Sequence, residues 1–197
     1  MIFKMLKEKL TQKKLVLASG SPRRQQFLKD LDLDVEIRLK PVEEVYPDEL
    51  KGEEIALYLA ELKAKAFENN LAENEILITG DTIVCIDDQA LGKPKDKTEA
   101  TKMLQNLSGR THEVISSVCL KSTQKTKTFC DKTVVYFKEL SSEEIEYYIE
   151  NHQPFDKAGA YGIQEWIGQI GVQKIEGSYF TVMGMPTHLL YDELLKF

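Results

Sequence analysis

The sequence predicts an α/β fold, since short apolar runs typical of strands alternate with amphipathic helical patterns along its 197 residues. Hydrophobic residues make up 42% of the chain and charged residues 29%, and this length can bury the core of one domain. No apolar run approaches the roughly 20 residues of a membrane span. The N-terminus also lacks the continuous apolar region of a secretory signal. We therefore expect one domain over residues 1–197, with no membrane contact.

The N-terminal part of the chain shows three helical patterns and two strand-like runs. Apolar residues recur at helical spacing in the first and third helices, whereas the strands are short and largely apolar. Small residues and a proline, Ser19 to Pro22, separate the first strand from the helix after it. The elements expected here are helices at 2–12, 23–31 and 52–69 and strands at 14–18 and 35–39.

The longest apolar run, Glu75 to Ile86, predicts a buried strand that Gly80-Asp81-Thr82 interrupts, followed by a turn at 87–89. Helix-capping pairs, Asp96 with Glu99 and Ser141 with Glu144, start two later helices. Residues 158–184 are rich in glycine and have only short apolar stretches. The remaining expected elements are helices ending near 107 and 150, strands at 113–121 and 127–138, and a terminal helix opening at Pro186.

The net charge and the cysteine content indicate which partners the protein can bind and in which cellular compartment it is expected. The net charge of −6 and the pI of about 5.3 disfavour binding to polymeric nucleic acid. Cys85, Cys119 and Cys130 cannot all pair with one another and form no CxxC motif. This pattern indicates a reduced, cytoplasmic protein.

The first candidate site is Leu17 to Arg24, LASGSPRR. Ser21 can cap a helix that Pro22 begins, and the free N–H groups of a helix N-terminus bind anions. Arg23 and Arg24 add donors with bidentate geometry for phosphate oxygens. The same pattern also fits a well-capped surface helix with two solvated arginines. Neither GxxxxGK nor GxGxxG is present, so this is not one of the common nucleotide loops.

The second candidate is Asp81, an acidic residue inside the most apolar run of the chain. A carboxylate is expensive to bury without a partner, and one placed this way tends to hold a metal or act as a base. The other interpretation is an aspartate at a strand end that points to water.

Glycine-containing turns supply further candidates. Gly92-Lys93-Pro94 and Ser108 to His112 can each reach a phosphate chain or serve as plain connections. In Lys157 to Gln164, KAGAYGIQ, two glycines allow a close backbone approach. Gln164 offers both a donor and an acceptor, which suits the polar edge of a base.

Taken together, these motifs resemble the Maf family of nucleoside triphosphate pyrophosphatases, from about Leu15 to the C-terminus. The family's motifs occur here in the family's order: LASGSPRR, Glu43-Glu44, Lys63 in the long helix, GDTIV, GKP, SGRTHEV and KAGAYGIQ. The resemblance implies hydrolysis of a nucleoside triphosphate between its α and β phosphates, giving a monophosphate and pyrophosphate. It also implies a strongly bent mixed sheet flanked by helices, in two lobes with a central cleft, as in Maf-like and ITPase-like proteins. Residues 1–13 would form an extra N-terminal helix.

The resemblance assigns roles to particular residues. Asp81 matches the proton acceptor, and Glu44 and Asp81 would hold a divalent cation, Mg²⁺ or Mn²⁺. Four residues would bind the substrate phosphates: Ser19, Arg24, Lys63 and Lys93. The cationic groups among them would neutralise the triphosphate and stabilise the leaving pyrophosphate. The family resemblance further implies a homodimer.

Three residues, Arg23, Thr82 and Gln164, match the trio linked to the branch of the family that acts on dTTP and UTP. The branch acting on 7-methyl-GTP has bulkier or acidic side chains at these places. Gln164 can hydrogen-bond the carbonyl and N–H edge of a pyrimidine, which a polar site discriminates well. We therefore predict hydrolysis of dTTP and UTP well above that of dATP or dGTP.

Two alternative functions remain open from the sequence. One is a pyrophosphatase for ITP or a modified purine triphosphate, and the other is a nucleotide-binding regulator of septum formation without turnover. In either case a basic cleft inside an acidic protein suits a small triphosphate better than a polymer. The residues expected to form that cleft are Arg23, Arg24, Lys63, Lys93, Arg110 and Lys157.

Overall fold

A seven-stranded mixed sheet organises residues 2–197, which are the residues that the computed structural model describes. Met1, part of the helix expected at 1–13, lies outside them. The strands are β1 Lys14–Leu17, β2 Val35–Ile37, β3 Glu75–Ile86, β4 Gln89–Leu91, β5 Thr111–Lys121, β6 Thr126–Phe137 and β7 Val172–Glu176. Their order is β2-β1-β3-β5-β6-β7, with β4 paired to β3. β1 runs parallel to β2 and β3, and the other pairings are antiparallel.

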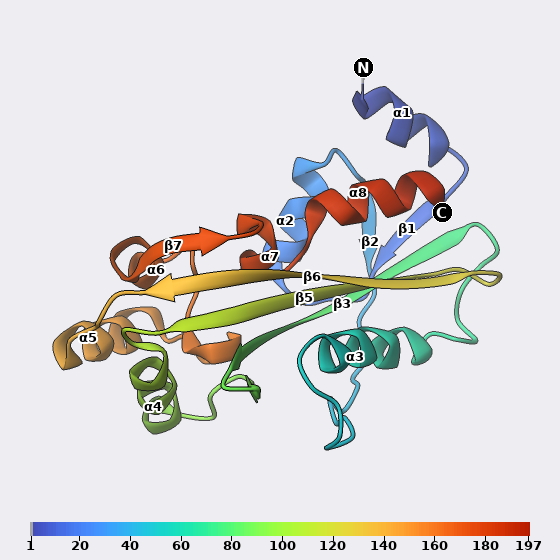
Figure 1. The fold of residues 1–197 in the computed structure, drawn as a ribbon. Coiled ribbons are helices and arrows are strands. Elements are labelled where there is room, and N and C mark those ends of the chain that lie inside the picture. The colour runs from blue at the N-terminus through green and yellow to red at the C-terminus, as the bar shows by residue number, and fades with distance from the viewer. Residues whose placement is uncertain (1) are drawn as a thin grey trace.

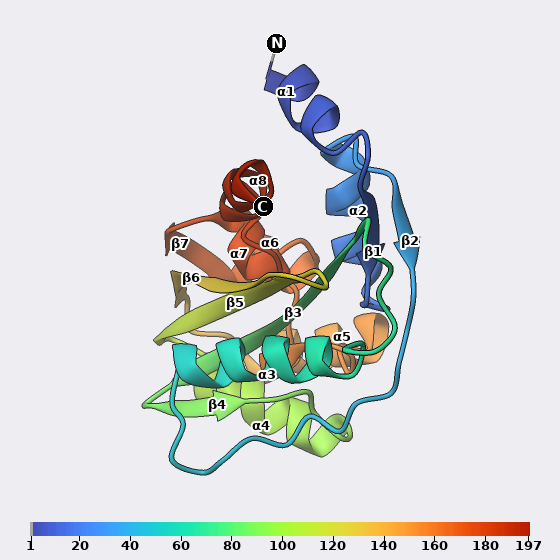
Figure 2. The ribbon, with the colours of Figure 1, turned by 90° about the vertical axis from the view of Figure 1, so that its right-hand side faces the viewer.

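Helices cover both faces of this sheet (Figure 1). They are α1 Ile2–Lys9, α2 Pro22–Asp30, α3 Glu53–Lys65, α4 Lys97–Leu107, α5 Ser142–His152, the 3₁₀ helix η1 Ala158–Ala160, α6 Trp166–Gly171, α7 Tyr179–Met183 and α8 Thr187–Lys196. Figure 2 shows α3 on one face of the long strands and α7 and α8 on the other. Within residues 2–197, no helix combines the length and apolar character required to cross a bilayer.

Three long strands, β3, β5 and β6, connect two lobes. In β3, Ile76 and Ile78 pack in a core with α2 and α8, whereas Val84 and Ile86 pack in a second core with α4 and α5. Because side chains alternate along a strand, Ile83 lies on the opposite face of β3, against α3. The predicted α/β architecture with a mixed sheet and two lobes is confirmed.

The predicted interruption of the strand at Gly80-Asp81-Thr82 is wrong. β3 runs through these residues, and Gly80 pairs with Val118 while Asp81 pairs with Ser117. A Cβ at residue 80 would lie 2.6 Å from the carbonyl oxygen of Ser117, so glycine here allows the close strand pairing to continue. The residues that looked like a break therefore bring Asp81 into the middle of the sheet.

Capping explains where several elements begin. Ser141 and Glu144 form the expected capping box at α5, with both reciprocal hydrogen bonds present. At α4 only half of the expected box forms, since Asp96 accepts from the N–H of Glu99 but the Glu99 carboxylate accepts from the N–H of Lys95. Short elements within the glycine-rich 158–184 segment, α6, β7 and α7, were not predicted.

An ion pair links Glu75 of β3 to Arg38, the residue that follows β2, and should make stability depend on pH. Arg38 donates bidentate hydrogen bonds of 3.0 and 2.8 Å to Glu75, whose side chain is 7% exposed. Arg38 is the main reason that the pKa of Glu75 falls from 4.5 to about 2. A depressed carboxyl pKa stabilises the folded state above the unfolded pKa, and that stability is lost as the pH falls from about 4.5 towards 2.

We therefore expect Glu75→Gln to lower the free energy of unfolding at pH 7 by about 1–3 kcal/mol. The variant should also flatten the decline in stability between pH 5 and about 2. Urea denaturation across this pH range measures both effects. Glu73→Gln, an exposed neighbour, is the matched control. Equal pH slopes for Glu75→Gln and the wild type would contradict the prediction.

Candidate active site

A cavity of about 620 Å³ lies between the two lobes. Its wall is built from the β1–α2 connection, the loop before α3, the middle of β3, the turn after β4 and the segments around η1 and the end of α7. Every site residue expected from the sequence lines it: Ser19, Arg23, Arg24, Glu44, Lys63, Asp81, Thr82, Lys93 and Gln164. The volume falls within the range of about 300–1,000 Å³ that is usual for small-molecule sites.

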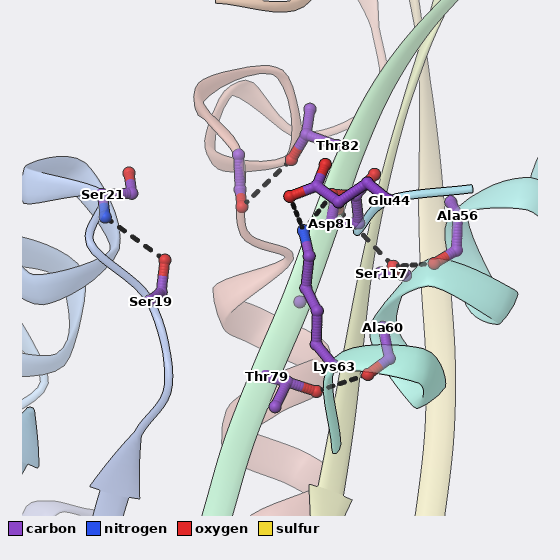
Figure 3. Close-up of polar contacts among 12 residues, drawn as sticks. Ser19, Ser21, Glu44, Ala56, Ala60, Lys63, Thr79, Asp81, Thr82 and Ser117 are labelled. Carbon is purple, nitrogen blue, oxygen red and sulfur yellow. Dashed lines mark hydrogen bonds and ion pairs between the residues drawn. The ribbon is translucent and has the colours of Figure 1, made fainter. Parts of the chain in front are cut away.

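Two carboxylates among the lining residues, those of Glu44 and Asp81, converge on the ammonium group of Lys63 (Figure 3). The Nζ atom of Lys63 lies 2.6 Å from Oδ1 of Asp81 and 3.0 Å from Oε1 of Glu44. The side chain of Asp81 is 10% exposed and that of Glu44 is 43% exposed, so Glu44 completes the cluster from the solvent side.

Helix α3 holds Lys63 over Asp81 through two buried hydroxyl groups on the sheet. Thr79 of β3 donates to the carbonyl oxygen of Ala60 at 2.6 Å, and Ser117 of β5 donates to that of Ala56 at 2.5 Å. Both contacts are visible in Figure 3. Because Thr79 lies on the same strand as Asp81 and Ser117 is the β5 residue paired with Asp81, these hydrogen bonds fix the helix against the strand that carries the carboxylate.

Basic neighbours keep Glu44 ionised. Burial alone would raise the pKa of Glu44, but Lys63, Lys93 and Arg24 outweigh it, and the pKa lies below its usual value. At neutral pH the cluster therefore offers a carboxylate at Glu44 that can accept hydrogen bonds or ligate a cation.

The donor set suits a hard divalent cation that is shared with a phosphate substrate. Glu44 and Asp81 supply oxygen ligands side by side, and the described residues contain no cluster of three or more His, Cys, Asp or Glu able to hold a metal ion. Mg²⁺ is usually held by one or two carboxylates together with water and substrate phosphates. Two carboxylates in an open cavity fit this pattern, since substrate oxygens and water would complete the coordination.

Ser19 and the start of α2 form the wall opposite this cluster. Ser19 is buried, and its Oγ atom accepts a 3.3 Å hydrogen bond from the backbone N–H of Ser21. Pro22 begins α2 as predicted, whereas the Ser21 side chain makes no capping hydrogen bond. The N-terminal end of a nine-residue helix therefore borders the cavity, where its dipole favours an anion.

Arg24 ties three parts of the chain together. Its Nε donates to the carbonyl of Gly184 at 2.9 Å, Nη1 to that of Gly80 at 2.9 Å, and Nη2 to Oγ1 of Thr82 at 3.0 Å. A weaker 3.4 Å contact reaches Ser19. Burial lowers the pKa of this guanidinium, and Asp81 opposes that shift. Most of the N–H donors of Arg24, which was expected to bind phosphate, are therefore already used to hold α2, β3 and the end of α7 together.

Thr82 is positioned by a serine that the sequence reasoning missed. Its hydroxyl lies 2.9 Å from Oγ of Ser116, which in turn donates to the carbonyl oxygen of Thr181 at 2.7 Å. Ser116 and Ser117 are fully buried between Ile115 and Val118 in the middle of strand β5. Adjacent hydroxyl residues in a predicted core strand were the signal that could have identified it.

Lys93 reaches the cavity because two glycine turns meet. The backbone N–H of Gly159 donates to the carbonyl of Gly92 at 3.0 Å. Gly159 has a φ of +67°, and a Cβ there would lie 3.0 Å from Val84, so this contact requires glycine. The GKP and KAGAYGIQ motifs are therefore neighbours in space.

A second group of charged side chains, on Arg23 and on the segment that leads to Gln164, borders the cavity. Arg23 is 3.9 Å from Asp156, and the buried Lys157 contacts Asp156 at 2.6 Å and Glu165 at 3.0 Å. Lys157 thus belongs to the cavity wall, as expected for the basic cleft, but two acidic groups compensate its charge.

The Ser108 to His112 turn does not reach the cavity. Arg110 is exposed and bonds to Asp87 and Asn106, so its predicted place in the basic cleft is wrong. His112 is 2% exposed, with Nε2 2.7 Å from the hydroxyl of Tyr161. This turn serves instead as a connection packed beneath the cavity wall.

Comparison with known proteins gives a consistent result. Residues 14–197 match the family described as Maf-like protein. A dTTP/UTP pyrophosphatase of Flavobacterium johnsoniae is 62% identical over 190 residues, spanning 96% of this chain and 98% of that protein. A dTTP/UTP pyrophosphatase of Porphyromonas gingivalis is 48% identical over 193 residues, spanning 96% and 97%.

A solved structure has a similar fold. The Ham1 protein of Staphylococcus aureus superimposes with a TM-score of 0.51 over 92% of this chain and 98% of its own. The two sequences are 19% identical, so this likeness concerns the fold alone.

Proposed function

The chain belongs to the Maf-like family, and from this premise we propose that it hydrolyses dTTP and UTP to the nucleoside monophosphate and pyrophosphate. Such an enzyme would remove surplus or modified pyrimidine triphosphates from the nucleotide pool. The observation that carries the proposal is that every residue to which the resemblance assigns a role lines one cavity of suitable size. The cytoplasmic location and the homodimer expected from the sequence belong to the same proposal.

The charged groups indicate how a triphosphate would lie. Lys63, Lys93 and the N-terminal end of α2 face the cavity and would neutralise the phosphates. Ser19 offers a hydroxyl group beside the start of α2. The guanidinium group of Arg24 holds the cavity wall together through hydrogen bonds within the protein, so at most part of it can contact the substrate. The phosphate chain would therefore lie along the Glu44–Lys63–Asp81 cluster.

Asp81 is the proposed proton acceptor for the attacking water. It lies on β3, and its Oδ1 atom is 2.6 Å from Nζ of Lys63, where a carboxylate can reach a water molecule in the cavity. Glu44 and Asp81 would hold the divalent cation, which when bound would offset phosphate charge in the transition state. As the water oxygen bonds to the α phosphorus, the proton of the water would pass to the Asp81 carboxylate. The bond between the α phosphorus and the oxygen that bridges it to the β phosphorus would break, and pyrophosphate would leave.

Removal of divalent cations is expected to abolish pyrophosphate release. Two carboxylates alone leave coordination positions open, so the cation should be held weakly and exchange readily. We expect EDTA-treated protein to lose activity with UTP and to regain it on addition of Mg²⁺ or Mn²⁺. Thermal unfolding in EDTA serves as the control and should stay unchanged. Full activity after exhaustive chelation would contradict the proposed ligand role of Glu44 and Asp81.

Gln164 and Arg23 are proposed to read the base, with Thr82 lining the same cavity. A substrate panel of dTTP, UTP, dATP, dGTP and ITP tests this directly. We expect kcat/KM for dTTP and UTP to exceed that for the purines by at least about tenfold. Replacing Gln164 by glutamate removes the amide donor and should change the ranking. A preference for ITP or another purine triphosphate would favour the alternative pyrophosphatase.

A further inference from the structure

The segment of residues 157–165, termed the Gln164 loop, presents the Gln164 amide without a protein partner. No hydrogen bond joins this amide to any residue from 6 to 197, although Gln164 lines the cavity. The side chain lies across Gly162, where an added Cβ would be 3.0 Å from Nε2 of Gln164. Because no group of the described residues holds the side-chain amide of Gln164, its orientation depends on the backbone of the Gln164 loop.

Tyr148 holds that backbone from beneath. This residue of α5 is fully buried, and its hydroxyl accepts a 3.1 Å hydrogen bond from the N–H of Gly162. The same hydroxyl donates to the carboxylate of Glu165. Burial, reinforced by Glu165, raises the pKa of Tyr148, so the phenol keeps the proton that it donates. One side chain thus fixes the positions on both sides of Gln164.

An ion pair closes the two ends of the Gln164 loop. Nζ of Lys157, at the start of η1, lies 3.0 Å from Oε1 of Glu165, at the start of α6. The side chains are 8% and 20% exposed, so solvent screens the pair less than it would a surface pair. Glu165 therefore accepts a hydrogen bond from Tyr148 and forms an ion pair with Lys157.

We propose that Tyr148, Lys157 and Glu165 are positioning residues that set base specificity by holding Gln164 in a fixed orientation. The inference rests on the proposed role of Gln164 as the residue that reads the base. An amide presents a donor and an acceptor at similar distances, so it discriminates the O4 and N3–H edge of uracil only if its orientation is fixed. If the Gln164 loop were less firmly held, the amide could rotate and hydrogen-bond to the edges of other bases.

The test compares two adjacent tyrosines. Tyr148→Phe removes the hydroxyl that bonds Gly162 and Glu165, whereas Tyr147→Phe alters an exposed neighbour on the same helix that packs on Trp166. We measure kcat and KM for UTP and dGTP. We expect Tyr148→Phe to lower the preference for UTP by about tenfold, mainly through KM for UTP. Tyr147→Phe should leave the preference unchanged.

Gly162→Ala gives a second, independent variant, because its Cβ would press on Gln164 and Glu165 without removing a hydrogen-bonding group. It should also lower the UTP preference. In a Gln164→Ala background, Tyr148→Phe should cause no further loss of preference, since the residue through which it acts is absent.

Each remaining outcome overturns the inference. A folded Tyr148→Phe or Gly162→Ala protein with the wild-type preference would do so, as would an equal fall in kcat/KM for both substrates, which marks a merely structural role. Additive losses in the double variant would show that Tyr148 acts elsewhere than through Gln164. These results leave the proposed function standing, whereas a wild-type protein that releases no pyrophosphate from UTP overturns both.

Discussion

Asp81→Asn is expected to lower kcat/KM for UTP by about 10²–10⁴-fold. The substitution keeps the shape of the side chain but removes the charge that would accept the proton of water and help to hold the cation. Asp81 is 10% exposed, and its Oδ1 atom lies 2.6 Å from Nζ of Lys63, so the variant changes a side chain that lies inside the charged cluster. Pyrophosphate release under saturating Mg²⁺ measures the loss.

The matched control for this variant is Asp88→Asn, in the exposed turn between β3 and β4. Asp88 has a φ of +60°, which asparagine also adopts readily, so the turn should persist. Asp88→Asn should retain wild-type kcat/KM, and both variants should unfold cooperatively on heating. If Asp81→Asn retained full phosphate release, Asp81 would be excluded as the proton acceptor, and a binding protein without turnover would gain support.

Lys63→Met is expected to lower kcat/KM by about 10²–10³-fold, because one fixed positive group is lost from the site of the developing phosphate charge. The change also leaves Glu44 and Asp81 without the ammonium group that they share. Lys65→Met, an exposed lysine two residues later on α3, is the control and should stay near the wild-type rate. Equal rates for the two variants would exclude Lys63 from the phosphate site.

The pH profile adds a second readout for Lys63. Lys63 is the strongest of the basic groups that lower the pKa of Glu44. Without Lys63 that pKa rises, so Glu44 becomes protonated at a higher pH as the solution is acidified. The acid limb of kcat/KM for Lys63→Met should therefore move upward in pH relative to that of Lys65→Met. A shift in the opposite direction would contradict the electrostatic role assigned to Lys63.

Local patterns were sufficient to predict most of the elements. Strands β1, β3, β5 and β6 and helices α2, α4 and α5 lie within a few residues of their expected places, because each has an apolar period or a capping pair of its own. The exceptions are α6, β7 and α7 in the glycine-rich 158–184 segment. These elements depend on contacts such as the pairing of Val134 and Val135 in β6 with Glu176 and Ile175 in β7. Such contacts are not encoded in neighbouring residues.

The sequence by itself determined the chemical types present and their order, and with them the family. Only the tertiary structure decided which charges act together. Lys63 and Asp81 meet although 18 residues separate them, and Arg24 reaches a carbonyl 160 residues away. Arg110 also lies in one of the family's motifs, but it bonds to Asp87, outside the cavity. The physical reason is that motif spacing reports contacts within one turn or strand, whereas strand register and helix packing set the distance between motifs.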